Sequence, residues 1–187
     1  MTNRRVGTEK KQHTIVAYVE DVPGVLNRVS SLFRRRGYNI ESLTVGHTET
    51  EGVSRMTIVL EADDTTARLI EANLYKLVNV IRVEDVTYLP SVTRDLALIK
   101  VRANTDVRPQ VLQVCDVFRA RVVDVDPESL MIEITGTEDK IQGLVEVLAP
   151  YGILEMVRTG RIAMTRGAGA IRVEPRTARI APERGAA

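Results

Sequence analysis

The chain has 187 residues, 44% of them hydrophobic, which is enough for one large domain or two small domains of roughly 80 residues each. Its formal net charge is only +1, and because the two ends, 1–12 and 166–187, are each net positive, the body between them is acidic, which argues against nucleic acid or a membrane as main partner. One cysteine excludes an intramolecular disulfide and a multi-cysteine metal site, and fits a reducing cytoplasm.

The first half of the chain alternates between strand and helix periodicity. Apolar residues fall on every second position in the strand stretches and at helical spacing in the helix stretches. The predicted elements are strand 13–20, helix 22–37, strands 39–46 and 53–60, helix 65–77 and strand 80–89. The pattern predicts a βαββαβ unit, in which Gly37 ends the first helix and Gly52 closes a hairpin turn.

After Pro90 the same order starts again. The predicted elements are strand 95–103, helix 108–120, strands 121–126 and 130–136, helix 139–150 and one last strand 153–166. We therefore predict an α+β fold with two ferredoxin-like βαββαβ domains, at 13–90 and 91–168, flanked by flexible ends at 1–12 and 169–187. A four-stranded sheet with both helices on one face leaves its other face and its edges uncovered, so such modules tend to pair.

The turn EDVPGVLNRV at 20–29 is a candidate anion site. A Pro-Gly turn between a strand and a helix exposes the backbone N–H groups of Gly24, Val25 and Leu26 at a helix N-terminus, where a carboxylate is favoured. An ordinary strand-to-helix turn explains the same residues equally simply, so the turn alone does not decide between the two.

Asn39, in the stretch GYNIESLTVG, is a second candidate because its amide can accept and donate at once, as binding an α-amino acid requires. Asn39 closing the turn after Gly37 is the alternative. Other polar residues have simpler interpretations: Arg34 to Arg36 complement a helix C-terminus, His13 and His47 are polar strand-end residues, and Cys115 belongs to the core. No nucleophile, base and orienting group come together at any expected catalytic spacing.

Five segments together resemble the small regulatory subunit of acetohydroxyacid synthase, also called acetolactate synthase. They are EDVPGVLNRV, RRRGYNIESLTVG, SRMTIVL, YKLVNVIRVEDV and RTGRIAMTRG, which follow the family order over roughly residues 13 to 169. GYNIESLTVG is specific to that family, whereas the PGVL turn is shared by ACT domains in general.

The resemblance implies an N-terminal ACT domain that binds effector and dimerises, followed by a ferredoxin-like domain. It implies that two ACT domains pair edge to edge and hold valine between them. Gly24, Val25 and Leu26 would bind the effector carboxylate, and Asn39 of the opposing chain would bind its amino and carboxylate ends. Asp21 matches a position that is Asn in some members, and its charge could attract the ammonium or repel the carboxylate.

The resemblance also implies that this chain has no catalytic site and no cofactor. The chemistry would belong to a large catalytic subunit that uses thiamine diphosphate, magnesium and FAD in cytoplasmic valine, leucine and isoleucine biosynthesis. This chain would activate that subunit and confer feedback inhibition by a branched-chain amino acid. Which of the three amino acids binds best stays open.

Two rival functions remain at this point. An RNA recognition motif has the same βαββαβ order, but it stacks bases on aromatic side chains, and aromatic residues are only 4% of this chain. A standalone ACT sensor that acts on another enzyme would share the PGVL turn, but has no reason to carry RTGRIAMTRG.

Overall fold

The computed structural model describes residues 9–168 and Val173, which fold as two compact units. The first unit runs to Val92 and resumes at Ala163, and the second comprises Thr93–Ile162. The sequence placed everything from 91 to 168 in the second domain, whereas residues 163–168 pack with the first unit. The predicted flexible tail 169–187, apart from Val173, and most of the predicted flexible N-terminus lie outside the described residues.

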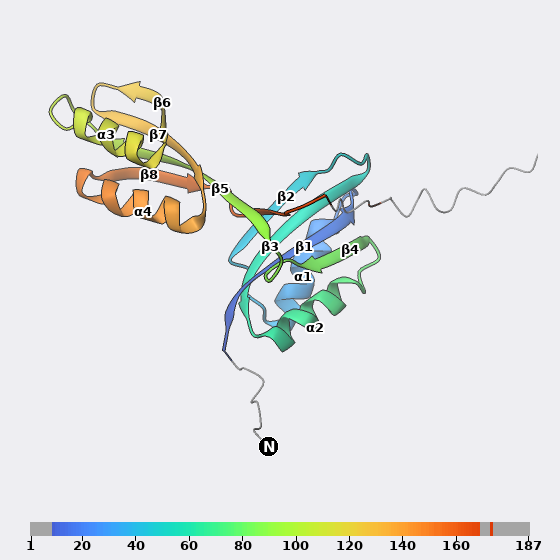
Figure 1. Cartoon of the computed structure of the whole chain (residues 1–187). Helices are drawn as coiled ribbons and strands as arrows, with labels where there is room; N and C mark the ends of the chain where they lie inside the picture. The colour runs from blue at the N-terminus through green and yellow to red at the C-terminus, as the bar shows by residue number, and fades with distance from the viewer. Residues whose placement is uncertain (1–8, 169–172, 174–187) are drawn as a thin grey trace, which may run out of the picture. The chain divides into compact units, whose positions relative to one another are not determined.

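The first unit is a four-stranded antiparallel sheet with two helices. Its elements are β1 (Lys11–Glu20), α1 (Val25–Arg36), β2 (Ser42–His47), β3 (Val53–Ala62), α2 (Asp64–Leu74) and β4 (Val80–Asp85). The strand order is β2-β3-β1-β4, and both helices lie on one face of the sheet (Figure 1). This arrangement confirms the predicted βαββαβ unit and makes β2 and β4 its edge strands.

The core of the first unit lies between the sheet and the two helices. Ile15, Ala17 and Val19 alternate along β1 and face this core, as the period of two predicts. The opposite face is not bare: Val16 of β1 packs in a second buried cluster that includes Ala163 and Val173. Burial of apolar surface by the returning segment explains why residues 163–168 belong with this unit.

Hydrogen bonds hold that returning segment on the sheet. Arg55 of β3 donates to the backbone oxygen of Ala163 at 2.5 Å, and the N–H of Arg166 donates to the oxygen of Pro90 at 2.7 Å. The expectation of a fully uncovered second sheet face is therefore wrong for the part covered by this segment.

The second unit repeats the topology. Its elements are β5 (Ser91–Arg102), α3 (Arg108–Phe118), β6 (Arg121–Asp126), β7 (Ser129–Gly136), α4 (Glu138–Leu148), the 3₁₀ turn η1 (Ala149–Tyr151) and β8 (Ile153–Arg158). The strand β9 (Ile162–Thr165), which pairs with β5, belongs to the first unit except for Ile162. The strand order β6-β7-β5-β8 matches that of the first unit. Cys115 is buried in this core as predicted, and burial raises the pKa of its thiol.

Two strand predictions need correction. The predicted last strand 153–166 is two strands, because Gly160 adopts φ 88° and turns the chain between β8 and β9. The predicted strand 39–46 begins only at Ser42, so Asn39 lies in the connection before β2. Among the described residues, no helix is both long and apolar enough to cross a membrane.

Asp63 caps the N-terminus of α2 and gives a prediction for stability at low pH. Its carboxylate accepts from the N–H of Thr66 at 2.8 Å, and this hydrogen bond lowers the pKa of the Asp63 carboxyl below its usual value. A lowered folded-state pKa contributes stability that is present above the unfolded-state pKa of ~3.9 and lost as pH falls through the folded value. We expect Asp63→Asn, which keeps a capping oxygen, to flatten the pH dependence of the urea midpoint below pH 4. A urea midpoint that falls as steeply below pH 4 in this variant as in the wild-type chain would contradict the assignment of Asp63 as the titrating cap of α2.

Candidate functional site

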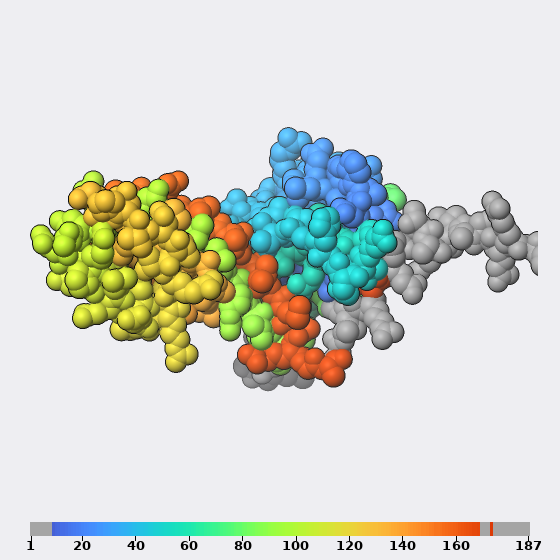
Figure 2. Space-filling view, turned by 90° about the horizontal axis from the view of Figure 1, so that it is seen from above, coloured from blue at the N-terminus to red at the C-terminus, as the bar shows by residue number. Residues whose placement is uncertain are grey.

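The candidate site centres on the turn between β1 and α1. Gly24 is the N-cap of α1 and adopts φ 85° and ψ −4°, a left-handed conformation that favours glycine. Residues 21–24 are exposed, whereas Val25 is buried under the helix. Figure 2 shows α1 and this turn (blue) on the surface beside the hairpin of β2 and β3 (cyan).

The N-terminus of α1 is left without an internal anion. It has no side-chain cap and no acidic residue in its first turn, in contrast to α2, which has Asp63 as cap and Asp64 in its first turn. Among the described residues, the backbone N–H groups of Gly24, Leu26 and Asn27 have no partner. An anion is therefore favoured here by both free donors and the helix dipole.

The backbone N–H groups without a partner differ at two positions from the predicted set of Gly24, Val25 and Leu26. The N–H of Val25 already donates to the oxygen of Val22, although at a long 3.4 Å, so it is a weaker donor than its neighbours. Asn27 was missed by the sequence reasoning, which stopped at Leu26. Its place in the first helical turn, where N–H groups lack intrahelical partners, was the signal that could have found it.

Asp21 is anchored beside the end of β2. Its N–H donates to the oxygen of Gly52 at 2.9 Å, and its carboxylate lies 3.2 Å from Nδ1 of His47, the last residue of β2. Both side chains are exposed to solvent. The contact shows that the C-terminal end of β2 lies next to the candidate anion turn.

Asn39 lies at the other end of α1. The helix has 12 residues, which at 1.5 Å per residue separates its two ends by about 18 Å. Asn39 is exposed and lines a cavity of ≈ 230 Å³ with Tyr38 and Thr66. Within one chain, Asn39 and the Gly24 turn are therefore too far apart to hold one amino acid together.

The strand that follows Asn39 is an edge strand. Among the residues that the structure describes, β2 stands at the end of the strand order of the first unit's sheet and pairs with β3, and an edge strand can add a further strand to its sheet. Val45 on this strand is 46% exposed. An exposed edge that carries an apolar side chain is suited to joining the sheet of a second chain.

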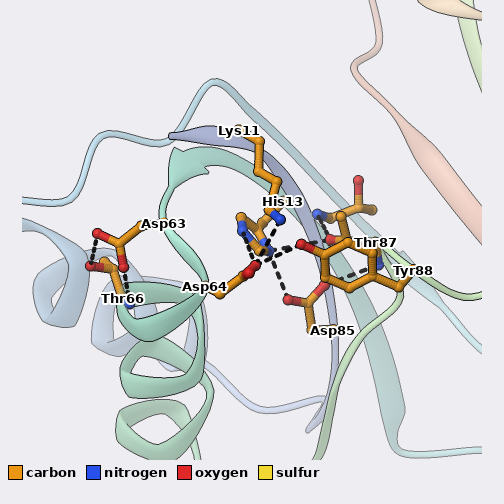
Figure 3. A network of polar contacts seen from close by, with 9 residues as sticks. Lys11, His13, Asp63, Asp64, Thr66, Asp85, Thr87 and Tyr88 are labelled. Carbon is orange, nitrogen blue, oxygen red and sulfur yellow. Dashed lines mark hydrogen bonds and ion pairs between the residues drawn. The ribbon is translucent and has the colours of Figure 1, made fainter. Parts of the chain in front are cut away.

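A second polar cluster surrounds His13 (Figure 3). His13 lies near the start of β1, as predicted for a strand-end residue, but it is buried, with only 1% of it exposed. Its Nδ1 lies 2.8 Å from Asp85, and its Nε2 lies 3.6 Å from Asp64. Asp64 also accepts from Tyr88 at 2.6 Å.

The His13 cluster has a structural role. It ties the start of β1 to α2 and to the connection after β4. In the part of the chain that the structure describes, no group of three His, Cys, Asp or Glu side chains could hold a metal ion.

Comparison with known proteins gives the family. A family described as "Small subunit of acetolactate synthase" matches residues 94–167, and one described as "AHAS small subunit-like ACT domain" matches residues 15–82. An acetolactate synthase small subunit of Mycolicibacterium smegmatis is 52% identical over 155 residues, covering 83% of this chain and 91% of the relative. The chain belongs to the acetolactate synthase small subunit family.

Other relatives agree with this assignment. A probable acetolactate synthase small subunit of Archaeoglobus fulgidus is 49% identical over 156 residues, covering 83% of this chain and 98% of that protein. The crystal structure of the Thermotoga maritima small subunit is 40% identical, with a TM-score of 0.80, and covers 85% of this chain and 99% of its own. Membership in this family implies a catalytic large subunit as partner and a regulatory role for this chain.

The left-handed turn at Gly24 yields a test of the local geometry. A Cβ added at Gly24 would meet no atom within 4 Å, so the cost of Gly24→Ala is conformational and we expect it to destabilise the chain by roughly 1 kcal/mol. Gly143→Ala is the matched control: inside α4 the same change favours the helix, and its Cβ would meet only Phe118 at 3.4 Å. The denaturant midpoint should therefore fall for Gly24→Ala and rise for Gly143→Ala. Equal shifts of the midpoint would contradict the left-handed conformation assigned to Gly24.

Proposed function

We propose that this chain activates the acetolactate synthase large subunit and makes it sensitive to feedback inhibition by valine. The observation that supports this most strongly is the division of the site between the two ends of α1. A free anion site lies at one end and the amide of Asn39 at the other, so two copies of the chain are needed to complete it. An effector bound between two chains can change how those chains are arranged.

Pairing of two β2 edges would complete the site. In an antiparallel pair, the start of one strand lies beside the end of the other. The end of β2 contacts the Gly24 turn through the Asp21 and His47 side chains, and Asn39 precedes the start of β2. A homodimer joined through β2 therefore places Asn39 of each chain beside the turn of the other, and forms two equivalent sites.

The groups at this shared site fit an α-amino acid with a branched side chain. The N–H groups of Gly24 and Leu26 would bind its carboxylate, and the amide oxygen of Asn39 from the second chain would accept from its ammonium. Asp21 would add negative charge near the ammonium. Val22 and Leu26, which are 42% and 43% exposed, provide apolar surface that favours an aliphatic side chain.

The regulatory effect would follow from linkage between this site and the catalytic partner. An effector that binds one dimer arrangement better shifts the equilibrium toward it, and a coupling of ~1–3 kcal/mol changes affinity about 5- to 150-fold. Thiamine diphosphate, magnesium and FAD would supply the chemistry in the large subunit, where two pyruvates, or pyruvate and 2-oxobutanoate, are condensed. This chain would act there in the cytoplasm, in branched-chain amino acid biosynthesis, without a cofactor of its own.

Asn39→Ala tests the shared site. We expect this variant to remove inhibition of the reconstituted synthase by valine while activation of the large subunit persists, because Asn39 is exposed and outside the sheet core. The measurement is the rate of acetolactate formation against valine concentration, with the variant and the wild-type chain added to the same large subunit.

Gln113→Ala is the matched control, because Gln113 also carries an exposed side-chain amide but lies in the second unit. It should leave the inhibition curve unchanged. Repeating the titration with leucine and isoleucine ranks the effectors. Normal valine inhibition of the Asn39→Ala variant would exclude this residue from the site.

A further inference from the structure

The candidate turn is not held in place by packing. Residues 21–24 are all exposed, and Val25 is the first side chain after β1 that enters the core. The direction in which the free N–H groups point is therefore set by hydrogen bonds, both the backbone bonds of Asp21 and Val25 in the turn and the bonds on either side of it. One buried side chain, that of Asn79, reaches both sides.

Asn79 lies just before β4 and is only 8% exposed. Its Nδ2 donates to the carboxylate of Glu20 at 2.7 Å, and its backbone oxygen accepts from the N–H of Glu20 at 2.8 Å. Its Oδ1 accepts from the guanidinium of Arg28. The amide orientation is fixed by these partners, because a carboxylate can only accept and a guanidinium can only donate.

The two partners of Asn79 bracket the turn. Glu20 is the last residue of β1 and directly precedes Asp21. Arg28 lies in the first turns of α1, and its own N–H donates to the oxygen of Gly24 at 3.0 Å. Asn79 thus joins the end of the strand to the start of the helix, across the exposed residues between them.

We propose that Asn79 is a positioning residue for effector binding, which orients the free N–H groups of the Gly24 turn through Glu20 and Arg28. The inference rests on the proposed function, in which this turn binds the carboxylate of a branched-chain amino acid. Asn79 itself lies beneath the turn and does not touch the effector. Its contribution is preorganisation, which strengthens binding by reducing the ordering that binding would otherwise require.

A reversal of hydrogen-bond polarity tests the proposal. Asn79→Asp keeps an acceptor for Arg28 but turns a carboxylate toward the carboxylate of Glu20, so the side-chain link to β1 is lost while the backbone hydrogen bond from Glu20 remains. We expect valine to bind the full chain about three- to tenfold more weakly in this variant, as loss of one buried hydrogen bond predicts. Adding Glu20→Gln supplies a donor at position 20, and the double variant should recover the wild-type affinity to within twofold.

The measurement is the Kd of valine by calorimetry on the intact chain, with the melting temperature of each variant measured in parallel. Ile70→Val, a fully buried position on α2, is the control for stability alone: it should lower the melting temperature without changing the Kd. If Asn79→Asp does not fold, Arg28→Gln removes the other contact from an exposed position, and it should also weaken binding.

The outcomes separate the two proposals. If the wild-type chain binds none of valine, leucine and isoleucine, the proposed function fails. If the wild-type chain binds valine and the folded Asn79→Asp variant binds it equally well, the positioning role is overturned. The positioning role would also be overturned if the double variant recovers its melting temperature but still binds valine weakly, because stability would then be restored without the affinity.

Discussion

The length of α1 is the constraint on which the proposed regulation depends. A helix of 12 residues is a rigid spacer, and it separates the free N–H groups of the Gly24 turn by about 18 Å from the helix end that precedes Asn39. A single chain can therefore present either half of an amino-acid site but cannot close the two halves around one ligand. In the proposed function, regulation by a small molecule would be a property of the dimer, because only the dimer would contain the whole site.

The sheet supplies the means of bringing the two halves together. β2 is an edge strand that begins near Asn39 and ends beside Asp21, so the proposed antiparallel pairing would bring both halves of two sites together. The same edge would be a liability in a monomer, because unpaired strand edges invite association. Association and effector binding thus use one feature of the fold, and Asn79 fixes the turn from beneath.

Much of this fold could be predicted from the sequence because its signals are local. Alternating apolar residues predicted β1, helical spacing predicted α1, and the Pro-Gly dipeptide predicted the turn between them. The features that were missed depend on residues far apart in the chain. His13 is buried by partners more than fifty residues away, and Asn79 meets Glu20 across 59 positions. The break at Gly160 was missed because the glycine sits between two apolar stretches that share a strand period.

Mixed dimers test the shared site most directly. Gly24→Asp places a carboxylate at the N-cap, where it would occupy the free N–H groups, and Asn39→Ala removes the opposing amide. Neither homodimer should bind valine. A dimer with one chain of each kind contains one site in which both halves are intact. Random exchange in an equal mixture makes half of the dimers mixed, so the mixture should restore about a quarter of the wild-type binding sites in a calorimetric titration. A mixture that binds no valine, under conditions in which the chains are shown to exchange, would contradict a site shared between two chains.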